Sequence, residues 1–246
     1  MNETLAQQLR FLRLPGLLAR WDEHVKAAAQ SNLSHTRLLT RVIEEEYRLK
    51  CDQARQQRLK LSKIPERWAM DTFPFDRQPR LNKKKILALY DSMAFLRDKQ
   101  NIIWLGGTGC GKTGLATSFL IQAIHQGARG RYVLFGDLLN ELHRSQADRS
   151  QNQVIRRYLN YDLLLIDEIG YVEAEPSQVG LFFTLLQKRH KQRSTLITSN
   201  LGFSEWSSFL KNTHLTAALI DRLTEASHVF NMKECVTLRT RMTADP

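Results

Sequence analysis

Residues 101–120 read NIIWLGGTGCGKTGLATSFL, and this stretch decides the fold of the chain. It begins with a short apolar run over 101–105, continues through a glycine-rich turn that ends in Gly-Lys-Thr, and closes with an amphipathic helical pattern. The spacing G-x-x-x-x-G-K-T from Gly106 to Thr113 is that of a complete phosphate-binding loop, which lies between a strand and a helix. The segment therefore predicts a nucleotide-binding site at the end of a strand.

Each part of this loop has a chemical task. Glycines allow positive φ and a close approach of the backbone to a phosphate chain, and the exposed amides at the start of the helix bind the anion. Lys112 is expected to reach the β- and γ-phosphates, and the Thr113 hydroxyl to occupy one position around Mg²⁺. We therefore expect ATP and Mg²⁺ as cofactors. The expected nucleotide contacts are Gly106, Gly107, Thr108, Gly109, Cys110, Gly111, Lys112, Thr113 and Gly114.

A second apolar run, 163–166, delivers the acidic pair Asp167 and Glu168 to the carboxyl edge of the sheet, where ligands bind in open α/β folds. Asp167 is expected to hold Mg²⁺ through water. Glu168 is expected to orient and deprotonate the attacking water as a general base. An apolar run ending in Asp-Glu is, taken alone, more often a strand with a solvated end. The position of Asp167, 55 residues after Lys112, favours the catalytic interpretation.

A third run, 194–200, reads STLITSN and ends in Asn200. The Asn200 amide is expected to donate to the γ-phosphate or to position the attacking water from the neighbouring strand end. Without the other motifs, an asparagine that ends a strand in a turn would be the simpler interpretation. Lys112, Glu168 and Asn200 are thus candidate catalytic residues, and Thr113 and Asp167 are candidate metal ligands.

From about residue 86 onward, apolar runs alternate with helical patterns, which is typical of a parallel sheet covered by helices. The sequence therefore predicts an α/β fold with one five-stranded parallel sheet. The expected strands are 101–105, 131–136, 162–167, 195–199 and 228–232. The expected helices are 86–98, 112–126, 137–145, 152–160, 176–190 and 214–225.

The chain before this core is predicted to be helical. Residues 1–65 form the expected N-terminal domain, in which Pro15 ends or kinks the first element. A second helix is expected from about Ser34 to Leu61. The prolines after it indicate a basic linker over 66–85, followed by the nucleotide-binding core over 86–246. The apolar face expected on the second helix comprises Leu39, Val42, Ile43, Tyr47, Cys51 and Ala54.

The charge of the chain is concentrated in one stretch. The chain has 36 lysines and arginines against 25 acidic residues, a net charge of +11. Residues 48–85 contain twelve basic and four acidic residues, so they carry +8 of that total. A one-signed excess of this kind favours binding to nucleic-acid phosphates over a merely solvated surface, without indicating sequence readout. The candidate phosphate contacts are Arg48, Arg55, Arg58, Lys60, Lys63, Lys83, Lys84 and Lys85, with Arg144 and Arg149 as weaker ones.

Composition also excludes several classes of protein. The sequence has no uncharged apolar run of about 18 residues and no signal-peptide layout, so we expect a cytoplasmic protein without membrane contact. Three widely spaced cysteines indicate neither a disulfide framework nor a zinc site. The seven histidines show no metal-ligand spacing.

The motifs GGTGCGKT, LLLIDE, ITSN and, at residues 220–223, IDRL together resemble AAA+ ATPases. They are most similar to the IstB-like transposition helpers, which are related to the helicase loader DnaC and the initiator DnaA. The resemblance implies that Arg222 acts as an arginine finger on the ATP of a neighbouring subunit, and that Arg239 senses the nucleotide. The family more often has Ser-Tyr-Arg where this chain has Thr-Leu-Arg at 237–239, and Arg241 is the alternative sensor.

The resemblance also implies an assembly. About fourteen residues follow the last expected strand, which is too few for the helical lid of most AAA+ proteins. The expected helices within 137–160 resemble the extra helix of initiator-type members, which disfavours a flat closed ring. The resemblance therefore implies a homo-oligomer that is open and helical, and whose formation depends on ATP.

Four functions are compatible with these observations. The resemblance favours an ATP-dependent helper that assembles on double-stranded target DNA, recruits and activates a transposase, and dissociates on ATP hydrolysis. The first alternative is a DnaC-like helicase loader that binds single-stranded DNA. A P-loop kinase for a small molecule is disfavoured by the Asp-Glu pair, by the Asn200 strand and by the arginine of the D-R-L motif. A structural DNA-bridging protein with a degenerate ATP site is disfavoured because every expected catalytic position is filled.

Overall fold

The computed structural model describes residues 1–30 and 34–239, which divide into two compact units. The first unit ends at Gln57 and the second begins at Arg58, which differs from the predicted boundary at residue 65. The reason is that the residues after position 57 pack into the second unit. Leu59 lies in its core, and the Ser62 carbonyl accepts a hydrogen bond of 2.8 Å from the Tyr132 backbone amide.

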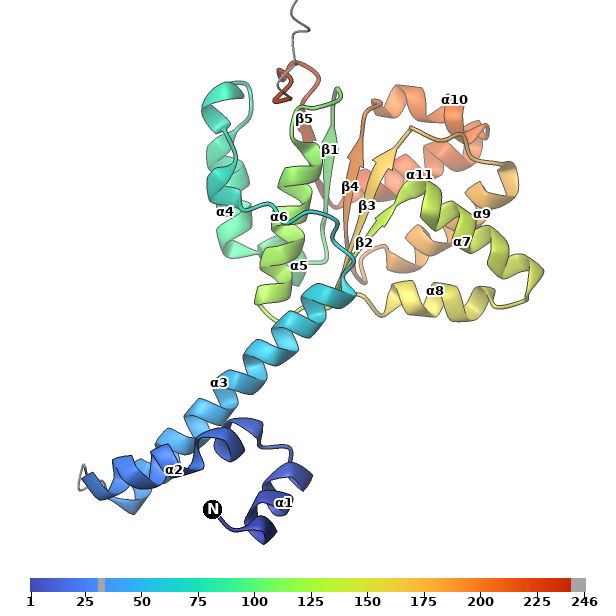
Figure 1. Ribbon diagram of the computed structural model, residues 1–246. Helices are drawn as coiled ribbons and strands as arrows, with labels where there is room; N and C mark the ends of the chain where they lie inside the picture. The colour runs from blue at the N-terminus through green and yellow to red at the C-terminus, as the bar shows by residue number, and fades with distance from the viewer. Residues whose placement is uncertain (31–33, 240–246) are drawn as a thin grey trace, which may run out of the picture. The chain divides into compact units, whose positions relative to one another are not determined.

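The second unit is built on one five-stranded parallel sheet with the strand order β2-β3-β4-β1-β5 (Figure 1). All five predicted strands are confirmed, and no strand end is shifted by more than two residues. The second strand stops earlier than expected because Phe135 directly begins a helix. The strands are β1 (Asn101–Leu105), β2 (Gly130–Leu134), β3 (Leu163–Ile169), β4 (Ser194–Ser199) and β5 (Ser227–Asn231).

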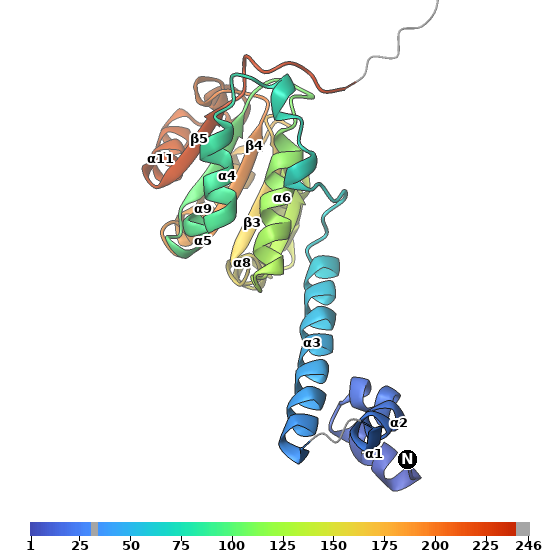
Figure 2. The ribbon, with the colours of Figure 1, turned by 90° about the vertical axis from the view of Figure 1, so that its left-hand side faces the viewer.

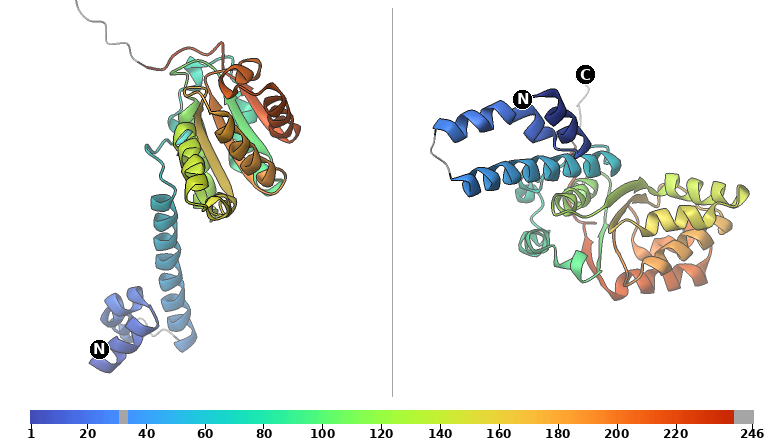
Figure 3. Two further views of the ribbon diagram at one scale, coloured as in Figure 1. Left: turned by 90° about the vertical axis from the view of Figure 1, so that its right-hand side faces the viewer. Right: turned by 90° about the horizontal axis from the view of Figure 1, so that it is seen from below.

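Helices cover both faces of the sheet, and each face has its own hydrophobic core. Figure 2 shows the face covered by α4, α5 and α6, and the left view of Figure 3 shows the opposite face. The predicted helix over 86–98 is broken at Met93, which has a φ of 47°. The helices on the first face are α4 (Lys83–Ser92), α5 (Ala94–Arg97) and α6 (Lys112–His125). Those on the second are α7 (Phe135–Ala147), α8 (Gln151–Leu159), α9 (Pro176–Arg189), α10 (Trp206–Leu210) and α11 (Thr213–Glu225), with the 3-10 turn η3 (Phe203–Glu205) before α10.

The segment expected to be a basic linker, 66–85, is part of the folded core. It contains the short 3-10 helices η1 (Met70–Thr72) and η2 (Phe75–Arg77), and its last three lysines form the first turn of α4. Its apolar side chains Met70, Phe73, Phe75 and Leu81 are buried against the face that carries α6. The prolines interrupt regular structure as predicted, but the intervening apolar residues dock the segment on the sheet domain.

The first unit is helical, as predicted, and consists of α1 (Glu3–Phe11), α2 (Pro15–Gln30) and most of α3 (His35–Leu61). Pro15 begins the second helix, where a proline needs no hydrogen-bond partner for its nitrogen. The Glu46 carboxylate accepts a bond of 2.8 Å from the Leu17 amide and so satisfies a free donor in the first turn of α2. The apolar face predicted on α3 is largely solvent-exposed: Leu39, Ile43 and Tyr47 are 62%, 65% and 68% exposed.

Two classes of feature do not occur in the described part of the chain. None of its helices is long and apolar enough to span a membrane. Within residues 1–30 and 34–239 there is also no group of three or more histidine, cysteine or acidic side chains that could hold a metal ion.

Candidate nucleotide-binding site

The phosphate-binding loop connects β1 to α6 and has the backbone conformation that its glycines permit. Gly109 and Gly111 have φ values of 80° and 96°, which side chains other than glycine rarely adopt. A Cβ atom at Gly111 would also lie 2.6 Å from a ring carbon of Phe73. Both glycines therefore serve the turn, and Gly111 also allows the close packing of the loop against the 66–85 segment.

Lys112 lies at the start of α6, with its side chain folded into the loop. Its Nζ donates hydrogen bonds of 2.7 Å to the carbonyls of Gly106 and Gly107. Burial lowers the pKa of the Lys112 amine, an effect that the charge of Asp167 opposes. The loop thus holds the Lys112 ammonium beside its backbone, and a cation at this place forms charge-assisted hydrogen bonds with a bound phosphate chain.

Three hydroxyl groups converge on the buried Asp167 carboxylate at the end of β3. Thr113 Oγ1 donates to Oδ1 at 3.0 Å, Thr198 donates to the same oxygen, and the Tyr132 hydroxyl donates to Oδ2 at 2.9 Å. The predicted metal ligands Thr113 and Asp167 are therefore in direct contact. A hydroxyl and a carboxylate beside a phosphate loop are oxygen ligands of the kind that Mg²⁺ takes in nucleotide sites, so these residues fit that ion.

Glu168 follows Asp167 and lies at a break in the sheet register between Ile166 and Ile169. Its φ of 64° is in the left-handed region, and its side chain is exposed toward the pocket described below. The Thr198 hydroxyl accepts a bond of 3.0 Å from the Glu168 amide. Thr198 thus contacts both acidic residues and fixes the turn that presents Glu168.

Asn200 lies just beyond β4, beside the turn that follows Glu168. Its Oδ1 is buried and has no hydrogen-bond partner within the part of the chain that the structure describes. The same oxygen would lie 2.8 Å from a Cβ atom at Gly170, so a larger residue there would displace the amide. A buried polar atom without a partner costs free energy. Because Oδ1 is an acceptor, a water molecule can pair with it, whereas a phosphate oxygen would pair with the NH₂ group of the same amide.

A single pocket of about 700 Å³ brings the predicted residues together. It contains ten of them: Thr108, Gly109, Gly111, Lys112, Thr113, Gly114, Asp167, Glu168, Asn200 and Arg239. Gly106, Gly107 and Cys110 belong to the same loop but do not line the pocket. The Cys110 side chain is buried, and its thiol donates to the Gly107 carbonyl at 3.0 Å.

Sequence reasoning missed several pocket residues. Six of them lie in the segment that was interpreted as a linker: Glu66, Trp68, Thr72, Phe73, Pro74 and Arg77. The other four lie elsewhere in the chain: Tyr132, Tyr171, Thr198 and Leu238. The Trp68 ring lies over the start of α6, with a ring carbon 3.3 Å from the position of a Cβ atom at Gly114. The signal that could have found the residues of the 66–85 segment was its three aromatic residues, Trp68, Phe73 and Phe75, in a short stretch rich in prolines and charges.

Residues 232–239 follow β5, form no helix and return to the phosphate loop. The Leu238 amide donates to the Gly109 carbonyl at 2.9 Å, and Arg239 lines the pocket. The buried Gln78 amide binds the backbone of Val236 twice, donating to its carbonyl at 2.6 Å and accepting from its amide at 3.0 Å. Arg239, one of the two candidate sensors, therefore lies at the nucleotide pocket of its own chain, whereas Arg241 is outside the described residues.

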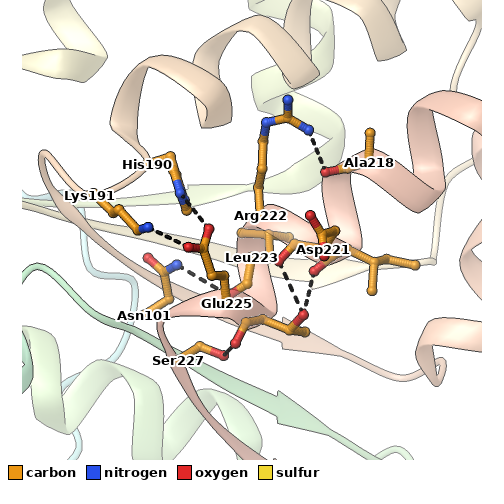
Figure 4. A network of polar contacts seen from close by, with 11 residues as sticks. Asn101, His190, Lys191, Ala218, Asp221, Arg222, Leu223, Glu225 and Ser227 are labelled. Carbon is orange, nitrogen blue, oxygen red and sulfur yellow. Dashed lines mark hydrogen bonds and ion pairs between the residues drawn. The ribbon is translucent and has the colours of Figure 1, made fainter.

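Arg222 does not line this pocket. It lies on α11, where its guanidinium donates to the Ala218 carbonyl at 2.9 Å (Figure 4). The guanidinium carbon also lies 5.1 Å from the centre of the Phe183 ring. The surrounding contacts fix α11 to the sheet domain: Glu225 pairs with His190 and Lys191, and the Asn101 amide donates to the Leu223 carbonyl at 3.3 Å. The structure therefore separates Arg222 from the catalytic residues of its own chain.

The predicted phosphate contacts are divided between the two units. Arg48 and Arg55 belong to the first unit, and the other six to the second. All are exposed or partly exposed. Lys83 and Lys85 are exposed. Their ammonium groups lie 5.5 Å from the centres of the Phe75 and Phe230 rings, respectively. Their contact with nucleic-acid phosphates stays a prediction, as does that of Arg144 and Arg149.

The fold and the site define a class. A parallel sheet, a phosphate loop leading into a helix, and an acidic pair at the end of a second strand are the parts of an AAA+ type P-loop domain. The solved structures agree on the fold. The crystal structure of the DnaC helicase loader matches 62% of this chain and 92% of its own, with a TM-score of 0.52 and 21% identity. The AMPPCP-bound DnaA from Aquifex aeolicus matches 70% of this chain and 51% of its own, with a TM-score of 0.56 and 16% identity.

The family follows from the sequence match. The model of the family described as IstB-like ATP binding protein matches residues 7–244, so the chain belongs to that family. It is 33% identical over 233 residues to a protein of Geobacillus stearothermophilus named as the putative ATP-binding protein of insertion sequence IS5376, and the match covers 95% of this chain and 92% of the relative. A Bacillus thuringiensis protein, named in the same way for insertion sequence IS232, is 32% identical over 90% of this chain and 88% of its own length.

Proposed function

We propose that this ATP-binding protein hydrolyses ATP. The observation that supports the proposal is the convergence of Lys112, Asp167, Glu168 and Asn200 in one pocket. Lys112 is placed to bind the β- and γ-phosphates, and Thr113 and Asp167 to hold Mg²⁺. When bound, this ion neutralises charge that develops on the phosphate oxygens. Glu168 takes a proton from the attacking water, and the Asn200 amide orients that water or binds the γ-phosphate.

We infer that Trp68 contacts the nucleoside base. Stacking on an aromatic ring contributes about 1–3 kcal/mol per base, so Trp68→Ala is expected to weaken ATP binding about tenfold. Isothermal titration calorimetry with ATP measures this directly. Trp21→Ala, which removes a tryptophan from the first unit, is the matched control and should leave the affinity unchanged. Equal affinities for the Trp68 variant and the wild type would exclude the base contact.

We further propose that the protein binds double-stranded DNA as an ATP-dependent oligomer and recruits and activates the transposase of the same mobile element. ATP hydrolysis then drives disassembly. The names of the relatives place them in insertion sequences, which encode transposases, and this supports the choice of partner. The net charge of +8 in residues 48–85 supports the DNA contact. Lysines and arginines that neutralise DNA phosphates release counterions, and this release favours binding.

The experiment that tests DNA binding compares a long duplex with a single strand of equal length, with ATP, with ADP and without nucleotide, across a salt series. The expected result is cooperative duplex binding that requires ATP. Changing Lys83–Lys85 to glutamine should reduce the slope of log K against log salt by about 0.9 for each phosphate that these lysines neutralise. The same change at the exposed Lys99, Lys188 and Lys211 is the control, because it removes an equal charge. Preference for the single strand would instead support a helicase loader.

A further inference from the structure

Tyr132 lies on β2, one of the two edge strands of the sheet, which is contacted by residues 61 and 62. Its backbone amide donates to the Ser62 carbonyl at 2.8 Å, and the Arg131 guanidinium donates to the Leu61 carbonyl at 3.1 Å. The first contact pairs a backbone amide that the edge position would otherwise leave without a partner. Both contacts fix the position of Tyr132 along the strand.

The side chain of Tyr132 reaches from this edge strand to the end of β3. Its ring is buried and lines the pocket, and its hydroxyl donates to Asp167 Oδ2 at 2.9 Å. An ionised carboxylate only accepts hydrogen bonds, so the Tyr132 hydroxyl is the donor in this contact. The hydroxyls of Thr113 and Thr198 both bind the other oxygen, Oδ1. Tyr132 is therefore the described side chain that fixes Oδ2, and with it the plane of the carboxylate.

We propose that Tyr132 is a positioning residue that orients the Asp167 carboxylate toward Mg²⁺-ATP. Two donors on one oxygen leave the carboxylate free to rotate about the bond to Cβ, whereas a third donor on the second oxygen prevents this rotation. Partners of this kind, which hold a metal ligand without touching the metal, change metal affinity or activity by about 10- to 100-fold when they are removed. The inference rests on the proposed function, because it assigns Asp167 to the Mg²⁺ of that site.

The test is Tyr132→Phe, which keeps the ring and removes the hydroxyl. Binding of a non-hydrolysable ATP analogue is measured by calorimetry in EDTA and across a Mg²⁺ series. We expect unchanged binding in EDTA and a Mg²⁺ midpoint about tenfold higher than in the wild type. Tyr132→Met, made in parallel, also lacks the hydroxyl and should show the same shift in the Mg²⁺ midpoint. This second variant provides the test if Tyr132→Phe folds poorly. Tyr158→Phe is the matched control, because it removes a tyrosine hydroxyl from the Glu141 carboxylate, outside the nucleotide pocket.

The outcomes separate this inference from the proposed function. A wild-type Mg²⁺ midpoint in the Tyr132 variants would overturn the inference, as would an equal loss of binding in EDTA, which would indicate a purely structural role. A wild-type protein that binds Mg²⁺-ATP without hydrolysing it contradicts the proposed ATPase instead. In that case the Mg²⁺ midpoints still decide the role of Tyr132.

Discussion

Arg222→Ala is expected to lower ATP turnover by about 10³- to 10⁵-fold, the effect of removing an arginine finger. The physical reason is that Arg222 lies outside the pocket of its own chain, held on α11 by Ala218 and Phe183, where it is accessible to a neighbouring subunit. Steady-state ATP hydrolysis in the presence of duplex DNA measures the effect. Nucleotide binding by the isolated subunit should stay at the wild-type level, because the pocket itself is unchanged.

A mixing experiment tests whether Arg222 acts between subunits. Arg222→Ala has an intact Glu168 and Glu168→Gln has an intact Arg222, so assemblies that contain both variants include complete sites. Activity should therefore return on mixing two inactive proteins. Arg193→Ala, at a partly exposed arginine that pairs with Asp162, is the control and should retain turnover. Absence of recovery, together with normal oligomers, would show that Arg222 does not complete a site in trans.

Glu168→Gln is expected to reduce the rate of ATP hydrolysis by about 10²- to 10⁴-fold, because the amide cannot accept the proton of the attacking water. ATP affinity should remain close to that of the wild type, since the phosphates are held by the loop and by Lys112. Single-turnover hydrolysis separates the chemical step from binding and product release. Under the proposed function the variant should also stay on duplex DNA after ATP is bound.

The control for this change is Glu173→Gln, an exposed glutamate that pairs with Lys211 at 2.6 Å and does not line the pocket. It removes the same charge from the loop after β3 and should leave the hydrolysis rate unaltered. If Glu168→Gln turned over ATP at the normal rate, the general base would have to be another group, and the mechanism proposed for this site would be wrong.

Much of the fold was predictable because its signals are local. The loop from Gly106 to Thr113 requires glycines at positive φ and a lysine at the start of a helix, and these are visible as residue types at fixed spacing. The five strands were predictable from apolar runs, which in β1, β3 and β4 are buried almost throughout. The ends were less certain, as at β2, where the helix α7 begins without a connecting loop.

The segment 66–85 shows why the rest was not predictable. Its charges and prolines indicated an extended linker, whereas Met70, Phe73 and Phe75 are buried and Trp68 lines the pocket. Whether an apolar residue in an irregular segment is buried depends on the surface it meets, and that surface is formed by residues distant in the sequence. The apolar face of α3 shows the opposite error. Helical spacing correctly placed its apolar residues on one side of the helix, but it did not reveal that this side is exposed.

The sequence by itself determined the chemistry of the nucleotide site: a phosphate loop, the acidic pair Asp167 and Glu168, and the order of strands and helices that brings them to one edge of a sheet. Only the tertiary structure decided which further groups surround them. The contacts of Tyr132 with Asp167 and of Gln78 with Val236 join residues 35 and 158 positions apart. Such contacts follow from strand order and from the return of the chain over the loop, and no local pattern encodes either one.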